Sequence, residues 1–202
     1  MTKFTFAFER LLGHEGGYAN IKGDRGGETY RGIARHYHPA WPGWQIVDEA
    51  KRLPNFPKSL EQDARLQSLV ADFYKVEFWD KIAGDKISSQ VIANELFDCA
   101  VNMDVADAVR ILQKSVNALR SPESPPLSED AVIGPKTIEV LNSWLSQSAL
   151  HPAVASNALL SVMLVLRGTR YVNIVERSSS QKQFAYGWFR RIFRHSEIDG
   201  EC

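Results

Sequence analysis

The chain begins with an amphipathic run. Apolar residues stand at Phe4, Phe8, Leu11 and Leu12, which is the spacing of one face of a helix. The pair Gly16-Gly17 then favours a helix end, because glycine adopts the left-handed cap conformation without strain. We therefore expect a short helix that is followed by a glycine-rich loop.

A glutamate stands at the point where this helix is expected to end. Glu15 directly precedes the glycine pair and so lies near the negative end of the helix dipole, where Lys or Arg is more usual. That field disfavours ionisation, and a carboxyl group that stays protonated near neutral pH is what a general acid requires. Such local inconsistencies often mark functional sites. Glu15 is therefore a candidate acid, and the alternative is a solvated glutamate at a helix end.

Helical spacing recurs through most of the remaining chain. It predicts helices over residues 32–37, 59–79, 87–102, 104–119, 134–145, 152–176 and 181–195. Strand-like alternation is scarce, although glycine-rich turns around short Tyr/Thr segments predict a small hairpin within residues 17–31. The expected fold class is mainly α, a helical bundle with a small β-hairpin or glycine-rich loop near the N-terminus.

Two proline-rich stretches interrupt these helices. Residues 39–44 contain two prolines and a glycine, which predicts a loop. Residues 120–128 are rich in proline and serine, which is typical of an exposed loop or linker.

Composition sets broad limits on function. The 202 residues suit one domain or two small ones, and the formal net charge of zero gives no general attraction to nucleic acid or to an anionic membrane. Glu9 and Arg10 interrupt any signal-peptide core. The most apolar run, residues 158–166, is about half of the roughly 20 residues that span a bilayer, so we expect a buried core helix. Cys99 and Cys202 lie far apart in the sequence, and they do not indicate whether the protein works in an oxidising or a reducing compartment.

An ordered series of short motifs runs through nearly the whole chain. Its members are His14–Asn20, Asp24–Thr29, Gly32-Ile33, Tyr74–Asp80, Leu96–Asn102, Leu112-Gln113, Val116-Asn117 and Ile133–Thr137. The series resembles glycoside hydrolase family 108, a family of N-acetylmuramidases that includes phage endolysins and bacterial proteins called secretion activators. The later motifs resemble the C-terminal region of that family, which is often described as a predicted peptidoglycan-binding domain. Relatives usually carry glycine where this chain has Asp104 and Ala131.

The resemblance implies a lysozyme-like α+β fold that hydrolyses the glycan strand of peptidoglycan, with Glu15 as the essential acid. It implies a catalytic region over residues 1–92 and a peptidoglycan-binding region over residues 93–202, packed as one lysozyme-like unit. No cofactor or metal is expected. The pair His36-x-His38 offers too few ligands and fits no zinc pattern.

Glycoside hydrolysis needs a second group besides the acid, either a negative charge near the developing oxocarbenium ion or a residue that activates water. Asp24 and Glu28 are the nearby candidates. Eight residues separate Glu15 from Asp24, which is similar to the Glu–Asp spacing of phage-type lysozymes. Those enzymes also hold the attacking water with a threonine, and Thr29 approximates it, one residue closer. The alternatives are a turn-forming role for Asp24 and a merely exposed carboxylate at Glu28.

Aromatic and amide side chains near these carboxylates are candidate sugar subsites. They are Tyr18, Asn20, Tyr30, Trp41 and Trp44, joined by Glu28 as a polar contact. The simpler interpretation is that the two tryptophans anchor a loop onto the core and that Thr29 and Tyr30 are ordinary strand residues.

The C-terminal helices are basic. Their cations are Arg167, Arg170, Arg177, Lys182, Arg190, Arg191 and Arg194. They form either a face that docks anionic peptidoglycan peptides and wall polymers or a solvated face whose arginines pair inward with acids of the N-terminal half.

We therefore expect a metal-independent muramidase that cleaves the bond between N-acetylmuramic acid and N-acetylglucosamine during cell lysis or wall remodelling. It would be made in the cytoplasm without a signal peptide, would reach the periplasm or cell wall through a holin or another route, and would act as a monomer. The alternatives are a lytic transglycosylase and a non-catalytic wall-binding protein that assists secretion.

Overall fold

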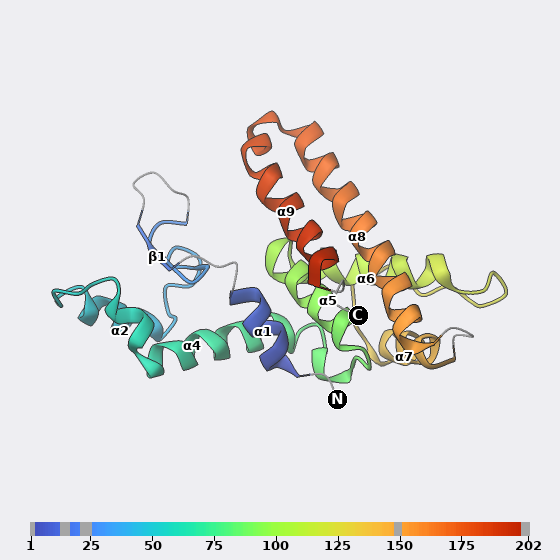
Figure 1. Ribbon diagram of the computed structural model, residues 1–202, viewed down its shortest axis with the longest axis horizontal. Helices are drawn as coiled ribbons and strands as arrows, with labels where there is room; N and C mark the ends of the chain where they lie inside the picture. Colours follow the sequence, from blue (N-terminus) through green and yellow to red (C-terminus); the bar gives the residue numbers. More distant parts are fainter. Residues whose placement is uncertain (1–2, 13–16, 21–25, 148–150, 199–202) are drawn as a thin grey trace. The chain divides into compact units, whose positions relative to one another are not determined.

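The computed structural model describes residues 3–12, 17–20, 26–147 and 151–198 (Figure 1). These residues divide into two compact units, residues 3–85 and residues 86–202, which are described separately below. The first unit contains α1 (Phe4–Leu12), β1 (Tyr18–Ala19), β2 (Thr29–Tyr30), β3 (Ile33–Ala34), α2 (Gly43–Ala50), α3 (Ser59–Gln62), α4 (Ala64–Tyr74) and the π-helical turn η1 (Lys75–Trp79). The second contains α5 (Gln90–Asn102), α6 (Val105–Leu119), α7 (Pro135–Gln147), α8 (Pro152–Arg177), η3 (Ser179–Gln181) and α9 (Lys182–Ile198), and the short 3-10 turn η2 (Gly84–Lys86) lies at the junction. The mainly helical fold class is confirmed.

The small sheet has three antiparallel strands in the order β1-β2-β3. Tyr18 of β1 lies opposite Tyr30 of β2, which in turn lies opposite Ile33 of β3. The two residues between β2 and β3, Arg31 and Gly32, have φ values of 48° and 79°. Left-handed backbone at both positions matches the twist of a two-residue hairpin. The predicted hairpin is thus confirmed, whereas the helix predicted over residues 32–37 is wrong because this turn returns the chain as a third strand.

Helix α2 begins inside the segment that was expected to be a loop. Residues 39–42 are irregular, but Gly43 and Trp44 already belong to the helix. A Cβ atom at Gly43 would lie 2.2 Å from the ring of Trp41, so only glycine permits this close approach. Gly43 therefore allows the Trp41 ring to pack closely against the helix, and it does not break the helix.

The long helix expected over residues 59–79 is interrupted at Asp63. This residue has extended backbone, and its carboxylate accepts a hydrogen bond from the Leu66 N–H at 2.9 Å, which caps the start of α4. The chain then continues without a break through α4 into the π-helical turn η1, which ends at Trp79.

Aromatic rings join α1 to the end of α4 and to η1. Phe4 contacts Trp79 with ring centroids 5.8 Å apart, and Phe8 contacts Tyr74 at 5.7 Å. Trp79 is completely buried, and its indole N–H donates to Asp85 at 2.9 Å. The aromatic residues of the 74–80 motif therefore hold the helix that leads to Glu15.

In the second unit, α5, α6 and α8 pack around a buried charge network. Arg167 of α8 donates to Glu95 at 3.0 Å and to Asp98 at 2.6 Å, both on α5, and its Nε donates to the Tyr171 hydroxyl at 2.9 Å. The Arg167 side chain is fully buried. Cys99 is also buried on α5, and this burial raises the pKa of its thiol.

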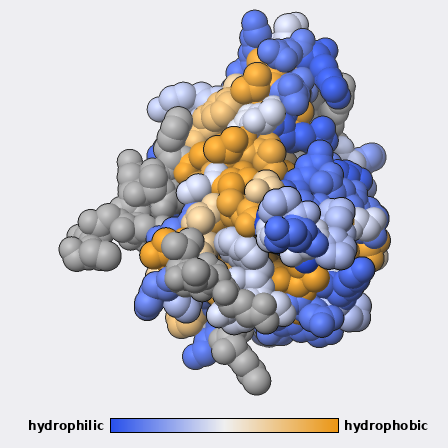
Figure 2. All heavy atoms as spheres, turned by 90° about the vertical axis from the view of Figure 1, so that its right-hand side faces the viewer, coloured by the Kyte–Doolittle hydropathy of each residue, from blue (hydrophilic) through white to orange (hydrophobic). Residues whose placement is uncertain are grey.

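Helix α8 contains the most apolar run of the chain. Within the described residues, it is the one helix whose length and mean hydropathy of 1.4 would suit a membrane span, and 28% of that window is buried. Leu159 and Met163 are completely buried, as predicted, but Val165 is 66% exposed. Figure 2 shows a band of apolar residues on the side where α7 and α8 lie in Figure 1. The buried ion pairs of Arg167 in the middle of α8 favour a core helix over a span.

The two positions at which relatives usually carry glycine differ in conformation. Asp104 has extended backbone and caps α6 through a hydrogen bond from the Asp107 N–H at 2.7 Å. Ala131, by contrast, has a φ of 64°, in the left-handed region that disfavours any residue with a Cβ atom.

Replacing Ala131 by glycine is expected to stabilise the protein by about 0.5–1 kcal/mol, because relief of left-handed strain exceeds the entropy that glycine adds to the unfolded chain. Chemical denaturation measures this difference. The matched control is Ala118→Gly on the exposed side of α6, which should lower stability by a similar amount. A destabilised Ala131→Gly protein would contradict the prediction.

Candidate functional site

Glu15 and Asp24, the predicted acid and its partner, lie outside the described residues, as does His14. Described residues bracket both: Leu12 ends α1 before Glu15, and Gly17 follows it. The candidate site is therefore described through the elements on either side of these two segments, namely α1, the three-stranded sheet and α2. These elements are called the framework below.

Arg31 ties three parts of this framework together. Its backbone N–H donates to the Gly17 carbonyl at 3.2 Å, which fixes the chain two residues after Glu15 onto the β2–β3 turn. Its own carbonyl accepts a hydrogen bond of 2.7 Å from the Tyr74 hydroxyl. Since Tyr74 also contacts Phe8 of α1, one tyrosine supports both flanks of the Glu15 segment.

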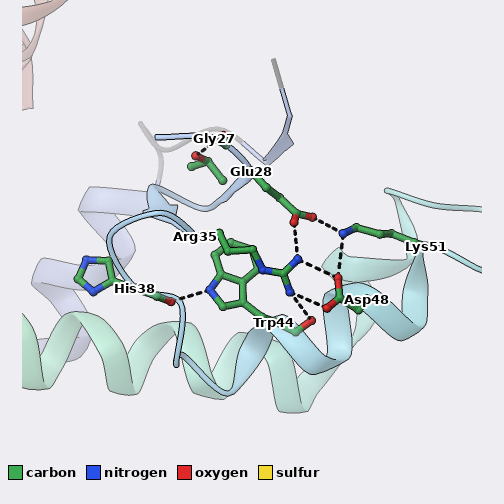
Figure 3. Close-up of polar contacts among 8 residues, drawn as sticks. Gly27, Glu28, Arg35, His38, Trp44, Asp48 and Lys51 are labelled. Carbon is green, nitrogen blue, oxygen red and sulfur yellow. Dashed lines mark hydrogen bonds and ion pairs between the residues drawn. The ribbon is translucent and has the colours of Figure 1, made fainter. Parts of the chain in front are cut away.

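A four-residue ion-pair cluster binds the hairpin to α2 (Figure 3). Glu28, directly before β2, lies 2.6 Å from Arg35 and 2.6 Å from Lys51. Both cations also contact Asp48 of α2, at 2.5 Å and 2.8 Å. The guanidinium of Arg35 stacks over the Trp44 ring, 4.8 Å from its centroid. The sequence singled out Glu28 alone, and nothing in its spacing marks Arg35, Asp48 or Lys51 as its partners.

The Glu28 carboxylate is only 9% exposed, so the interpretation of Glu28 as a merely exposed residue is wrong. Its burial raises its pKa, but hydrogen bonds from Lys51 and Tyr18 and the charge of Arg35 outweigh this and hold the pKa below its usual value. The hydrogen bond from Arg35 likewise holds the pKa of Asp48 well below its usual range. Glu28 is therefore an ionised anchor whose charge is already compensated.

Tyr18 extends this cluster toward the start of β1. Its ring packs edge-on against Phe56 with centroids 4.7 Å apart, and its hydroxyl donates to Glu28. Partial burial, followed by this hydrogen bond, raises the pKa of Tyr18. Asn20 is exposed at the end of β1. The subsite roles of Tyr18 and Asn20 stay predictions.

Of the two strand residues after Glu28, Thr29 is partly buried and Tyr30 is buried. The Thr29 hydroxyl donates to the Gly27 carbonyl at 3.3 Å, and its role in holding water stays a prediction. Tyr30 is only 1% exposed, and its hydroxyl donates to the Leu60 carbonyl at 3.2 Å and accepts from Gln67 at 2.9 Å. This burial argues against the substrate contact of Tyr30, which stays a prediction.

The two loop tryptophans anchor the chain to the core. Their rings contact each other edge-on at 5.2 Å, and Trp41 and Trp44 are 8% and 3% exposed. The Trp41 indole donates to the Leu69 carbonyl at 3.3 Å, and that of Trp44 donates to the His38 carbonyl at 2.8 Å (Figure 3). The burial and these hydrogen bonds agree with the simpler interpretation as loop anchors and argue against sugar subsites at the two rings, whose subsite role stays a prediction.

One further carboxylate lies beside the framework. Glu61 of α3 is exposed, and a Cβ atom built at Gly17 would lie 4.0 Å from its Oε1 atom. Nothing in the sequence marks it, because Glu61 follows Gly17 by 44 positions and only the folded chain brings α3 to the hairpin.

Several of the C-terminal arginines pair inward, but their partners are acids of their own unit and not of the N-terminal half that one interpretation expected. Arg167 and Arg191 contact Asp98, and Arg170 contacts Asp107 of α6. Arg177, Lys182 and Arg190 are exposed. Among the described residues, no group of three His, Cys, Asp or Glu side chains is arranged to hold a metal ion.

Two protein families match the chain in turn. Residues 8–103 match the family model described as Glycosyl hydrolase 108, and residues 107–193 match the one described as Predicted Peptidoglycan domain. The fold is similar to the solved structure of SagA from Brucella abortus, with a TM-score of 0.60 and 24% identity over 96% of this chain and 92% of that one. This likeness shows the fold alone. None of the curated proteins matches the sequence.

The ion pairs of Glu28 lead to a prediction about stability. Glu28→Gln should lower the free energy of unfolding at pH 7 by about 2 kcal/mol, since it leaves Arg35 and Lys51 short of a buried, charged acceptor. The pKa values of Glu28 and Asp48 are lowered in the folded state, so their contribution is complete above the ordinary pKa values of 4.5 and 3.8 and is lost as pH falls through the lowered values.

Denaturation of both proteins between pH 7 and pH 2 measures this. The difference between the wild type and Glu28→Gln should shrink on acidification. The control is Glu49→Gln, an exposed position on the same α2 helix, which should change stability by less than about 0.5 kcal/mol. Equal effects of the two substitutions at pH 7 would refute the anchoring role of Glu28.

Proposed function

We propose that this chain, which joins a glycosyl hydrolase 108 region to a predicted peptidoglycan domain, is an N-acetylmuramidase. The bond cleaved is the one between N-acetylmuramic acid and N-acetylglucosamine in the glycan strand of peptidoglycan. The observation that carries the proposal is the family match over residues 8–103, which contain Glu15 and the hairpin.

In the proposed reaction the carboxyl group of Glu15 donates its proton to the glycosidic oxygen as the bond to the anomeric carbon breaks. Charge then develops on the sugar ring, and a carboxylate on the other side stabilises it or orients the water that attacks. Asp24 takes this second role. Glu28 suits it poorly, because two cations already compensate its charge and little of it is exposed.

The framework supports this proposal through preorganisation. A general acid works only when its proton is held within hydrogen-bond reach of the leaving oxygen. The Arg31–Gly17 hydrogen bond and the aromatic contacts of α1 restrain both ends of the short segment that carries Glu15. The Glu28 cluster similarly restrains the chain that follows Asp24.

The proposed setting follows from the substrate. The protein is made in the cytoplasm and acts at the cell wall or in the periplasm, which it reaches through a holin or another export route, as a monomer. Its role there is cell lysis or wall remodelling.

Glu15→Gln is expected to reduce the digestion of purified peptidoglycan by about 100- to 10,000-fold, which is the usual contribution of a general acid. Released reducing ends measure the rate, and circular dichroism checks the fold. Glu9→Gln on the exposed side of α1 is the matched control and should retain full activity. Wild-type digestion by Glu15→Gln would refute the proposal.

The second group is tested by Asp24→Asn, compared with Glu61→Gln. Asp24→Asn should lower the rate at least as much as Glu61→Gln, and the reverse order would transfer the second role to Glu61, the carboxylate beside Gly17.

Mass spectrometry of the products separates the remaining mechanisms. Reducing ends support a hydrolase, anhydro ends indicate a lytic transglycosylase, and sacculus binding without released sugar indicates a non-catalytic protein.

A further inference from the structure

A groove of about 290 Å³ lies between α6 and α8 in the second unit. Its lining comes entirely from these two helices, with Asp107, Arg110, Ile111 and Lys114 on α6 and Leu166, Thr169, Arg170 and Asn173 on α8. The volume is at the small end of the range for ligand sites, which is roughly 300–1,000 Å³. The groove therefore suits a short ligand or one segment of a polymer.

The groove contains more positive than negative charge. Three of its lining residues are cations and one, Asp107, is an acid. Asp107 contacts both Arg110, at 3.2 Å, and Arg170, so two guanidinium groups share a single carboxylate. Lys114 has one acidic neighbour, Glu129, at 3.9 Å, and its side chain is 48% exposed. These cations keep donor capacity for an added anion.

Arg170 also has a hydrogen-bond donor that is not in use. Its Nε atom is buried and has no hydrogen-bond partner among the residues that the structure describes. A buried donor without a partner is unfavourable, and an acceptor that reached this atom from the groove would satisfy it. An ionised acceptor such as a carboxylate oxygen suits this donor, because hydrogen bonds between charged partners are stronger than neutral ones.

The apolar residues of the groove indicate which kind of anion it binds. Ile111 and Leu166 stand beside the cations, so the groove pairs a place for a small apolar group with a place for a negative charge. The peptide stems of peptidoglycan repeat this combination, since alanine methyl groups alternate with the free carboxylates of glutamate, diaminopimelate and terminal alanine. Sugars supply hydroxyl groups instead.

We propose that the α6–α8 groove binds the carboxylates of the peptidoglycan peptide stem through Arg110, Lys114 and Arg170. This inference rests on the proposed action on peptidoglycan, but it concerns the peptide and not the glycan bond. The groove thus gives the second unit its own ligand, and nucleic-acid phosphate is the competing anion that the test must separate.

The test measures binding by calorimetry in the full chain carrying Glu15→Gln. The probe is the tripeptide L-Ala-γ-D-Glu-meso-diaminopimelate, and its fully amidated form and chitotetraose are the comparisons. Lys114→Gln and Arg170→Gln should each weaken tripeptide binding about tenfold, which is the loss of one charged hydrogen bond. Amidation of the probe should weaken it further, and added salt should weaken it moderately.

Arg177→Gln is the matched control, because this exposed arginine lies in the last turn of α8 outside the groove. Its affinity should stay within twofold. Lys114→Gln keeps the test free of folding effects, since Lys114 is half exposed and its ion pair is long.

Equal binding of the amidated probe, equal affinities of the Lys114→Gln and Arg177→Gln proteins, or tighter binding of a DNA oligonucleotide than of the tripeptide would overturn the inference. So would the absence of tripeptide binding. Digestion of peptidoglycan by the wild type is measured separately, so that failure of this site and failure of the muramidase proposal give different results.

Discussion

The structure of the first unit depends on the β2–β3 turn, where Arg31 uses both of its backbone groups. The Arg31 N–H holds the Gly17 carbonyl, and the Arg31 carbonyl holds the Tyr74 hydroxyl. A residue with a Cβ atom occupies left-handed backbone there, at a cost of about 1–2 kcal/mol. These two hydrogen bonds help to offset that cost. The strain is tolerated because the same turn sets the position of the chain just after Glu15.

Charge has a structural role in both units. In the first, Glu28 joins the hairpin to α2 through cations that also bind Asp48. In the second, Arg167 joins α8 to α5 at a fully buried site. Burying ion pairs usually adds little net stability, because desolvation offsets the attraction. Their effect is on specificity, since any packing arrangement that left one buried partner unpaired would be far more costly.

The sequence predicted the long helices well because their 3.6-residue periodicity extends over many turns. It missed β3, a strand of two residues, because two residues carry no periodicity. It also missed α2 as a whole, whose first turn allows packing between Gly43 and Trp41 that overrides the usual effect of glycine. The motif series pointed to the family and to Glu15. It did not reveal that Tyr30, Trp41 and Trp44 are buried, because aromatic residues that bind sugars and those that anchor loops look alike in a sequence.

The two units divide the chemistry of peptidoglycan between them in the proposals made above. The glycan strand is nearly uncharged at the bond to be cut, so the acid that acts there needs a low local charge and a precise position. The peptide stems carry the charge, and cations can recognise them at a separate site. A chain with zero net charge gains little from long-range steering. Two weak sites on one polymer raise the local concentration of the substrate by avidity instead. A basic groove on a neutral protein is consistent with that solution.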